Sequence, residues 1–225
     1  MIDIFNNSID DALVGSTPVK KICVGADVVW EKSAPVVPYD SRVEWLYSSG
    51  NGQYIDTGIV YDSSVTIEAS VKLTGSVTGN YMFGIYTKVN NVAQRWAIHC
   101  YSSSAVRPHF GTVTNKNASF SRNVFHTISA NYRNFVVDGT TTNTNASAFT
   151  PKQDVRIFLF GRSNNNNADT FRALYIDWFK IYKGGILVRD YISVRKDNVG
   201  YLHDKVSNTL FGNLGTDSFT YGNDV

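Results

Sequence analysis

Val65-Thr-Ile-Glu-Ala-Ser-Val-Lys-Leu73 is the stretch that decides the fold class, because apolar and polar side chains alternate through most of it. In an extended chain, successive side chains point to opposite faces, so this segment has one dry face and one wet face. Such a pattern is typical of an antiparallel sheet that packs one side on a core and leaves the other in solvent.

Nine more segments of similar length and composition follow or precede it, with turn-forming residues between them. They are Tyr54 to Val60, Tyr81 to Thr87, Arg95 to Tyr101, Arg107 to Val113, His126 to Tyr132, Asn134 to Asp138, Val155 to Phe160, Arg172 to Tyr182 and Ile186 to Ile192. About ten strands at this spacing predict an all-β sandwich or barrel. We expect its core to be dominated by Phe158, Phe160, Leu174, Ile176, Trp178 and Phe179.

The composition of the 225 residues agrees with an all-β chain. Aromatic residues make up 13%, charged residues 18%, and there are only three glutamates, whereas long helices usually carry Glu, Lys, Ala and Leu. The 21 basic and 19 acidic side chains leave a net charge of +2, so a nucleic acid is not an expected partner. No stretch approaches the ~20 apolar residues of a membrane span, so membrane insertion is not expected.

The first forty residues form a separate part of the chain. Val19 to Val24 and Val28 to Glu31 flank a glycine-containing turn, which predicts a β-hairpin. The proline-containing segment from Lys32 to Ser41 then reads as a semi-rigid linker. We therefore expect an N-terminal segment over residues 1–37 and a sandwich over residues 38–225.

The sequence leaves the secondary structure of the first residues open and does not predict a signal peptide. Ile2, Phe5, Ile9 and Leu13 have nearly helical spacing, but neighbouring Asn and Gly residues make a strand pair equally possible. The stretch from Met1 to Asn7 has neither a basic region nor an apolar run, so no signal peptide is predicted.

The two cysteines are Cys23 and Cys100, and they are 77 positions apart in different modules. We expect two buried free thiols rather than a disulfide.

Two groups of motifs carry a family resemblance. His126-Thr-Ile-Ser-Ala-Asn-Tyr132 followed by Phe135-Val-Val-Asp-Gly139 resembles the strand pair of laminin-G-like, concanavalin A-like domains. Phe158-Leu-Phe-Gly161 and Phe171-Arg-Ala-Leu-Tyr-Ile-Asp-Trp-Phe-Lys-Ile-Tyr182 look like later strands of that fold, with Ala173 where the family has glycine. The resemblance implies a two-sheet antiparallel jelly roll.

The ends of the chain resemble proteins of gut bacteria and their phages. The tail from Leu187-Val-Arg-Asp-Tyr-Ile-Ser-Val-Arg195 to Gly212 is similar to the ending of many such domains. Gly15-Ser-Thr-Pro-Val-Lys-Lys-Ile22, with Val29-Trp30, resembles a short hairpin module of phage virion proteins. These resemblances imply a virion component, such as a fibre, tail or capsid-decorating protein, located on the phage particle surface.

In a virion protein, the N-terminal segment would contact other virion proteins or further copies of the chain, and we expect a homo-oligomer. The apolar candidates for this contact are Ile2, Phe5, Val24, Val29 and Trp30. The alternative is a secreted glycan-binding module, extracellular or on the bacterial cell surface, whose true N-terminus precedes Met1. A glycoside hydrolase or lyase is the third hypothesis.

Enzymatic signatures are absent from the sequence. The family's glucanases use two carboxylates in the order Glu-x-Asp-x-Glu, and none of Glu31, Glu44 and Glu68 has that neighbourhood. There is no Gly-x-Ser-x-Gly, His-Glu-x-x-His, phosphate-binding loop or dinucleotide fingerprint. His99 and Cys100 are adjacent, so in a strand they point to opposite faces and form neither a zinc site nor a nucleophile pair. We therefore predict a protein that is not an enzyme.

A binding face is the positive prediction. If Arg95 to Tyr101 and Arg107 to Val113 form a hairpin, then His99, Tyr101, Arg107 and His109 share its polar face. Aromatic rings and planar polar groups of this kind bind sugars, so glycans are candidate ligands. A solvated face that binds nothing is the alternative reading.

Two loops offer weaker candidates. Asn165 and Asn166 lie in an asparagine run that either contacts the same glycan or forms a plain exposed turn. Laminin-G-like domains often bind calcium, and the loop carboxylates Asp62, Asp138 and Asp169 are available here. Their spacing does not define a site, so no metal or cofactor is predicted and calcium stays an open possibility.

Overall fold

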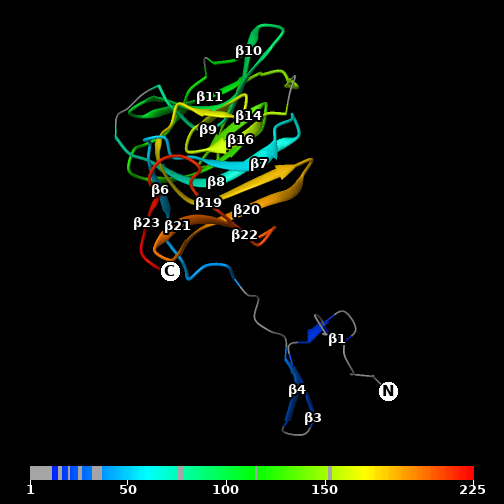
Figure 1. Ribbon diagram of the computed structural model, residues 1–225. Helices are drawn as coiled ribbons and strands as arrows, with labels where there is room; N and C mark the ends of the chain where they lie inside the picture. Colours follow the sequence, from blue (N-terminus) through cyan, green and yellow to red (C-terminus); the bar gives the residue numbers. More distant parts are fainter. Residues whose placement is uncertain are drawn as a thin grey trace. The chain divides into compact units, whose positions relative to one another are not determined.

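The computed structural model divides into two compact units, Met1–Val37 and Pro38–Val225 (Figure 1). It describes residues 12–14, 17–19, 21–24, 27–31, 37–75, 79–114, 116–151 and 154–225. None of these residues lies in a helix, so the described part of the chain has no helix that could cross a membrane.

The first unit contains two antiparallel strand pairs. β1 (Ala12–Val14) pairs with β2 (Thr17–Val19), and β3 (Lys21–Val24) pairs with β4 (Asp27–Glu31). The second pair is the predicted hairpin. Leu13 belongs to a strand, whereas Ile2, Phe5 and Ile9 lie outside the described residues.

The second unit consists of two antiparallel sheets packed against each other, which makes it a two-sheet β-sandwich. The larger sheet has the order β15-β14-β13-β8-β19-β20-β21-β22, with β5, β6 and β23 attached beside this path. Its strands are β5 (Ser41–Arg42), β6 (Leu46–Ser49), β8 (Val65–Leu73), β13 (Phe125–Ala130), β14 (Asn134–Val137), β15 (Thr140–Asn143), β19 (Ala173–Lys183), β20 (Ile186–Lys196), β21 (Val199–Asp204), β22 (Thr209–Phe211) and β23 (Thr220–Tyr221).

The smaller sheet has the order β12-β11-β10-β9-β16-β7, and a short hairpin, β17-β18, joins it through a parallel pairing of β17 with β9. Its strands are β7 (Ile55–Val60), β9 (Tyr81–Val89), β10 (Val92–Ser102), β11 (Ala105–Gly111), β12 (Ala118–Ser119), β16 (Arg156–Leu159), β17 (Arg162–Asn164) and β18 (Asn167–Asp169). The ten strands predicted from the sequence are all present, with ends that differ by a few residues.

The core lies between the two sheets. On β8, Val65, Ile67, Ala69, Val71 and Leu73 are at most 1% exposed, as their alternation with polar residues predicts. Phe83 of the smaller sheet meets Phe179 of the larger one edge to face, with ring centroids 5.2 Å apart. A fully buried ring of this kind stabilises the fold by about 1.5–3 kcal/mol, so such contacts hold the sheets together.

The core prediction is wrong for Trp178. β19 carries a bulge between Ile176 and Trp178 where it pairs with β8, which shifts the alternation by one residue. Phe179 therefore points into the core, and Trp178 is half-buried on the outer side.

The predicted linker is too long at its C-terminal end. The Asp40 backbone N–H donates to the Arg195 carbonyl over 2.9 Å, and β5 pairs with β20. Asp40 and Ser41 therefore belong to the sandwich, because their backbone bonds are made by its larger sheet.

Cys100 is a fully buried free cysteine, as expected. Burial raises the pKa of its thiol to about 11, so the group is neutral at physiological pH. The side chain of Cys23 lies outside the described residues.

Candidate functional site

The outer surface of β9, β10 and β11 carries a cluster of aromatic and cationic side chains. On β10, Trp96, Ile98 and Cys100 point into the core and are fully buried, so the alternate residues point outward. The register of β10 with β11 pairs Ala97 with His109 and His99 with Arg107. We call this surface the arginine–tyrosine face, and it comprises Tyr81, Tyr86, Arg95, His99, Tyr101, Arg107, His109 and Arg162.

The structure brings together the four residues predicted for a polar face. The rings of His99 and His109 stack with centroids 4.8 Å apart, and the guanidinium of Arg107 lies 3.5 Å from the Tyr101 ring centroid. The Arg107 Nε also donates to the Asn117 side-chain oxygen over 2.8 Å. Stacking and hydrogen bonding hold the Arg107 fork in one orientation, while Tyr101 stays 40% exposed.

Tyr81 supports the two histidines. Its ring centroid lies 5.0 Å from that of His99 and 5.5 Å from that of His109. Its hydroxyl is hydrogen-bonded to Nδ1 of His109 at 2.9 Å, and both side chains are more than nine-tenths buried. The floor of the face is therefore packed and ordered, below the more exposed Tyr101 and Arg107.

Arg162 and Arg95 complete the face, and the sequence analysis missed both. The Arg162 guanidinium lies 4.5 Å from the Tyr81 ring centroid and 4.7 Å from that of Tyr86. The Arg95 guanidinium lies 5.1 Å from the same Tyr86 ring centroid. Arg95 precedes Ala97 by two positions, so extending the alternation of β10 would have found it. Arg162 has no such signal, because it arrives through the parallel pairing of β17 with β9.

Both histidines of the face are neutral at physiological pH. Burial, followed by the charges of His99 and of Arg95, Arg107 and Arg162, lowers the pKa of His109 to about 3. Burial also lowers the pKa of His99, and the same arginines act in that direction. The positive charge of the face thus comes from guanidinium groups.

Aromatic rings, neutral imidazoles and guanidinium forks suit ligand binding better than acid–base catalysis. Among the residues that the structure describes, Asp169 is the carboxylate that contacts the face, and it accepts two hydrogen bonds from Arg162 at 2.9 and 2.7 Å. The residues of the arginine–tyrosine face include no second carboxylate with which Asp169 could form the pair that glycoside cleavage uses.

Asn165 and Asn166 form the turn between β17 and β18. Their φ angles are 50° and 66°, a conformation that asparagine tolerates in tight hairpin turns. The Asn166 amide donates to the Asp154 carbonyl and accepts from the Arg156 N–H, at 2.6 and 2.8 Å. Both residues are exposed, and the Asn166 side chain ties the turn to the backbone of Asp154 and Arg156.

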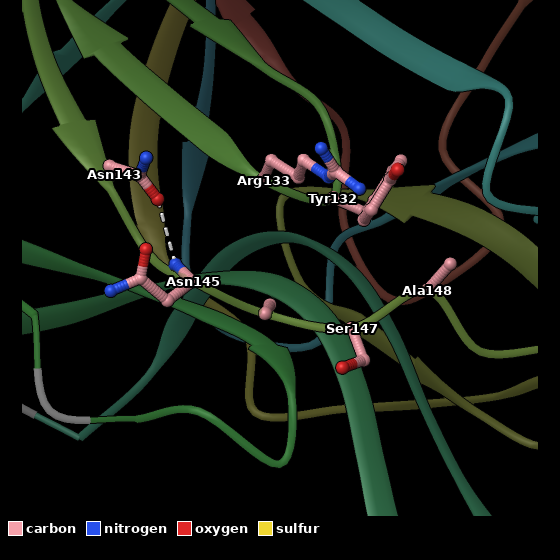
Figure 2. A pocket seen from close by; sticks show the side chains of 7 residues that line it. Tyr132, Arg133, Asn143, Asn145, Ser147 and Ala148 are labelled. Carbon is pink, nitrogen blue, oxygen red and sulfur yellow. Dashed lines mark hydrogen bonds between the residues drawn. The ribbon is translucent and has the colours of Figure 1, made fainter.

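A cavity of about 430 Å³ lies elsewhere on the sandwich (Figure 2). It is lined by Tyr132, Arg133, Asn143, Asn145, Ala146, Ser147 and Ala148. The Asn145 N–H donates to the Asn143 side-chain oxygen over 2.8 Å, the dashed line in Figure 2. The side-chain oxygen of Asn143 is therefore already hydrogen-bonded within this segment of the chain. The cavity has one tyrosine and one arginine, compared with three tyrosines, two histidines and three arginines on the arginine–tyrosine face.

The three aspartates considered for calcium do not come together. Asp62 pairs with Lys183 at 2.9 Å, Asp138 with His126 at 2.6 Å and Asp169 with Arg162. Among the residues that the structure describes, no group of three or more His, Cys, Asp or Glu side chains could hold a metal ion. Each carboxylate has its own structural partner instead.

The His126 and Asp138 pair links the two motif strands that carry the laminin-G-like resemblance. The same carboxylate accepts from the Thr127 N–H at 2.9 Å, and these bonds lower the pKa of Asp138. Asp138 and Gly139, with φ angles of 47° and 81°, form a tight turn between β14 and β15.

No protein-family model and no curated protein sequence matches the chain.

The apolar candidates for virion or intersubunit contact cannot be placed as side chains. Ile2 and Phe5 lie outside the described residues. Val24 lies in β3, and Val29 and Trp30 lie in β4, where the structure describes the backbone alone.

Proposed function

We propose that the second unit, Pro38–Val225, is a carbohydrate-binding sandwich of the jelly-roll type, and that the arginine–tyrosine face binds the glycan. The observation that carries this proposal is the convergence of Tyr81, Tyr86 and Tyr101 with two neutral histidines and three guanidinium groups on one sheet surface. Sugar rings stack on aromatic side chains, and planar polar groups bind their hydroxyls.

The proposed role of the whole chain is a phage virion component, a fibre, tail or capsid-decorating protein that binds host or mucosal glycans. The resemblances of the N-terminal hairpin and of the tail to phage and gut-bacterial proteins support it. In this proposal the first unit attaches to other virion proteins and the sandwich faces outward. A secreted bacterial glycan-binding module would use the same face, and it is the competing assignment.

Glycan binding is tested with the full-length chain on an array of neutral and acidic oligosaccharides, followed by titration calorimetry with the best ligand. Tyr101→Ala removes an exposed ring, so we expect about tenfold weaker binding. Tyr132→Ala is the matched control, since Tyr132 also lies beside an arginine, 5.2 Å from its ring, but lines the cavity of Figure 2. Absence of any glycan ligand, or equal losses in both variants, would overturn the assignment of the face.

The virion role is tested by labelling particles from the source with an antibody against residues 43–225 and viewing them by electron microscopy. Labelled particles are the expected result. Label on bacterial surfaces with bare particles would transfer the assignment to the secreted module and leave the glycan-binding proposal standing.

A further inference from the structure

Arg162 shows how the arginine–tyrosine face holds a carboxylate. Its Nε and Nη2 donate to the two oxygens of Asp169, in the parallel geometry that guanidinium groups form with planar anions. Arg95 and Arg107 have no such partner among the described residues. Arg107 donates to a neutral amide, and the Nε of Arg95 is buried without any hydrogen-bond acceptor.

The three guanidinium groups all lie near the stacked rings of His99 and His109. Arg95, Arg107 and Arg162 all lie near enough to lower the pKa of His99 and of His109. Two carboxylates on described strands of the same sheet are already paired, since Asp169 is bound by Arg162 and Asp56 pairs with Arg156 at 3.1 Å. Positive charge therefore exceeds negative charge on a partly desolvated surface, where electrostatic interactions are stronger than in bulk water.

The strand register places Arg95 and Arg107 at the two ends of this region. Arg107 lies opposite His99, which follows Arg95 by four positions on β10, or about 13 Å at ~3.3 Å per residue. Between them lie the short side chain of Ala97 and the ring of His109. An oligosaccharide lying along β10 would contact both guanidinium groups, with Tyr101 and Tyr86 available for its rings.

We propose that the glycan recognised by this face is anionic, a saccharide whose carboxylate or sulfate groups are bound by Arg95 and Arg107. This inference rests on the proposed glycan-binding function and adds its ligand class. Carboxylate and sulfate groups both present at least two anionic oxygens that can accept hydrogen bonds from one guanidinium group, and the experiment separates them.

The test uses the full-length chain and matched ligand pairs. Tetragalacturonate is compared with its carboxyl-reduced form, and a chondroitin sulfate tetrasaccharide is compared with its desulfated form, by calorimetry at 50 and 300 mM NaCl. We expect at least tenfold tighter binding of one charged member than of its partner, and a weaker affinity at the higher salt concentration. Arg95→Gln and Arg107→Gln should each weaken that binding about tenfold or more, whereas Arg133→Gln, beside the cavity, should leave it unchanged.

The outcomes separate this inference from the proposed function. If neutral glycans on the array bind as tightly as their charged counterparts, the anionic class is wrong and glycan binding stands. If no glycan binds, the proposed function fails as well. Circular dichroism of the glutamine variants establishes that they are folded, so a loss of binding reports on the missing guanidinium group.

Discussion

His109 is a titratable ring kept neutral by its surroundings. It is 8% exposed and lies against Tyr81 and His99, with Arg95, Arg107 and Arg162 acting on its charge. A pKa of about 3 in the folded state, below the ordinary value of about 6.5, means that the unfolded chain binds this proton more readily. Its contribution to stability is therefore complete above about pH 6.5 and is lost as the pH falls towards 3.

We predict that the free energy of unfolding decreases between pH 6.5 and 4.5, by about 2 kcal/mol from His109 alone. His99, whose pKa is lowered as well, adds to the decrease. Urea unfolding of the wild type and of a His99→Gln, His109→Gln double variant at the two pH values measures this difference. The pKa values of Asp62, Asp138 and Asp224 are lowered from 3.8, so these carboxylates titrate below pH 4.5, the lower limit of the measurement. Equal slopes for the two proteins would contradict the prediction.

The residues of the candidate site were predictable in part. Alternation along one hairpin was enough to group His99, Tyr101, Arg107 and His109, because sequence neighbours in a hairpin have a register that their turn fixes. Tyr81 and Tyr86 needed the pairing of β9 with β10, which shifts at a bulge between Ile98 and His99. A shift of that kind is set by packing and not by the local sequence.

At the scale of elements, the β17-β18 turn shows why an asparagine run is structural as well as polar. Asn166→Ala would remove two side-chain hydrogen bonds to the backbone and leave a residue with a β-carbon at a φ of 66°. We predict a loss of about 1–3 kcal/mol in the free energy of unfolding, measured by urea titration. Asn166→Gly should lose less, since glycine adopts this φ without strain.

Asn167→Ala is the control for the turn. Asn167 is exposed, and its side chain makes only long contacts of 3.4 and 3.5 Å within the turn. It should change stability by less than about 0.5 kcal/mol. If Asn167→Ala lost as much stability as Asn166→Ala, the two hydrogen bonds of Asn166 would not be the cause of the stabilisation, and the prediction would be wrong.

Strand existence was easier to predict than strand geometry. β8 runs from Val65 to Leu73, as its alternation predicts, and its pairing with β13 has no register shift along the strand. On β19 the bulge before Trp178 reverses the alternation, so Phe179 is in the core and its neighbour Trp178, which was also expected there, is not. The short strands β5, β6, β22 and β23 carry too few residues for a periodic signal, and pairing with long neighbours defines them.

At the scale of the whole molecule, the sandwich has what it needs to fold without the first unit. All buried residues of its core cluster lie between Leu46 and Phe219, on both sheets of the second unit. We predict that a variant lacking Met1–Val37 keeps the thermal unfolding midpoint of the sandwich and has the same affinity for a soluble monovalent glycan. A lower midpoint would show that the first unit stabilises the sandwich.

The same deletion tests the proposed role of the first unit, because attachment and oligomerisation are assigned to it alone. Light scattering should give a multiple of the chain mass for the full-length protein and a monomer for residues 38–225. On a surface densely coated with glycan, an oligomer binds through several faces at once, so its apparent affinity should exceed that of the monomer by about 10²–10⁴. The soluble monovalent ligand is the control, since it reports one face at a time and should bind both proteins equally. The same number of protomers in both proteins would place the intersubunit contact within the sandwich and remove the first unit from this role.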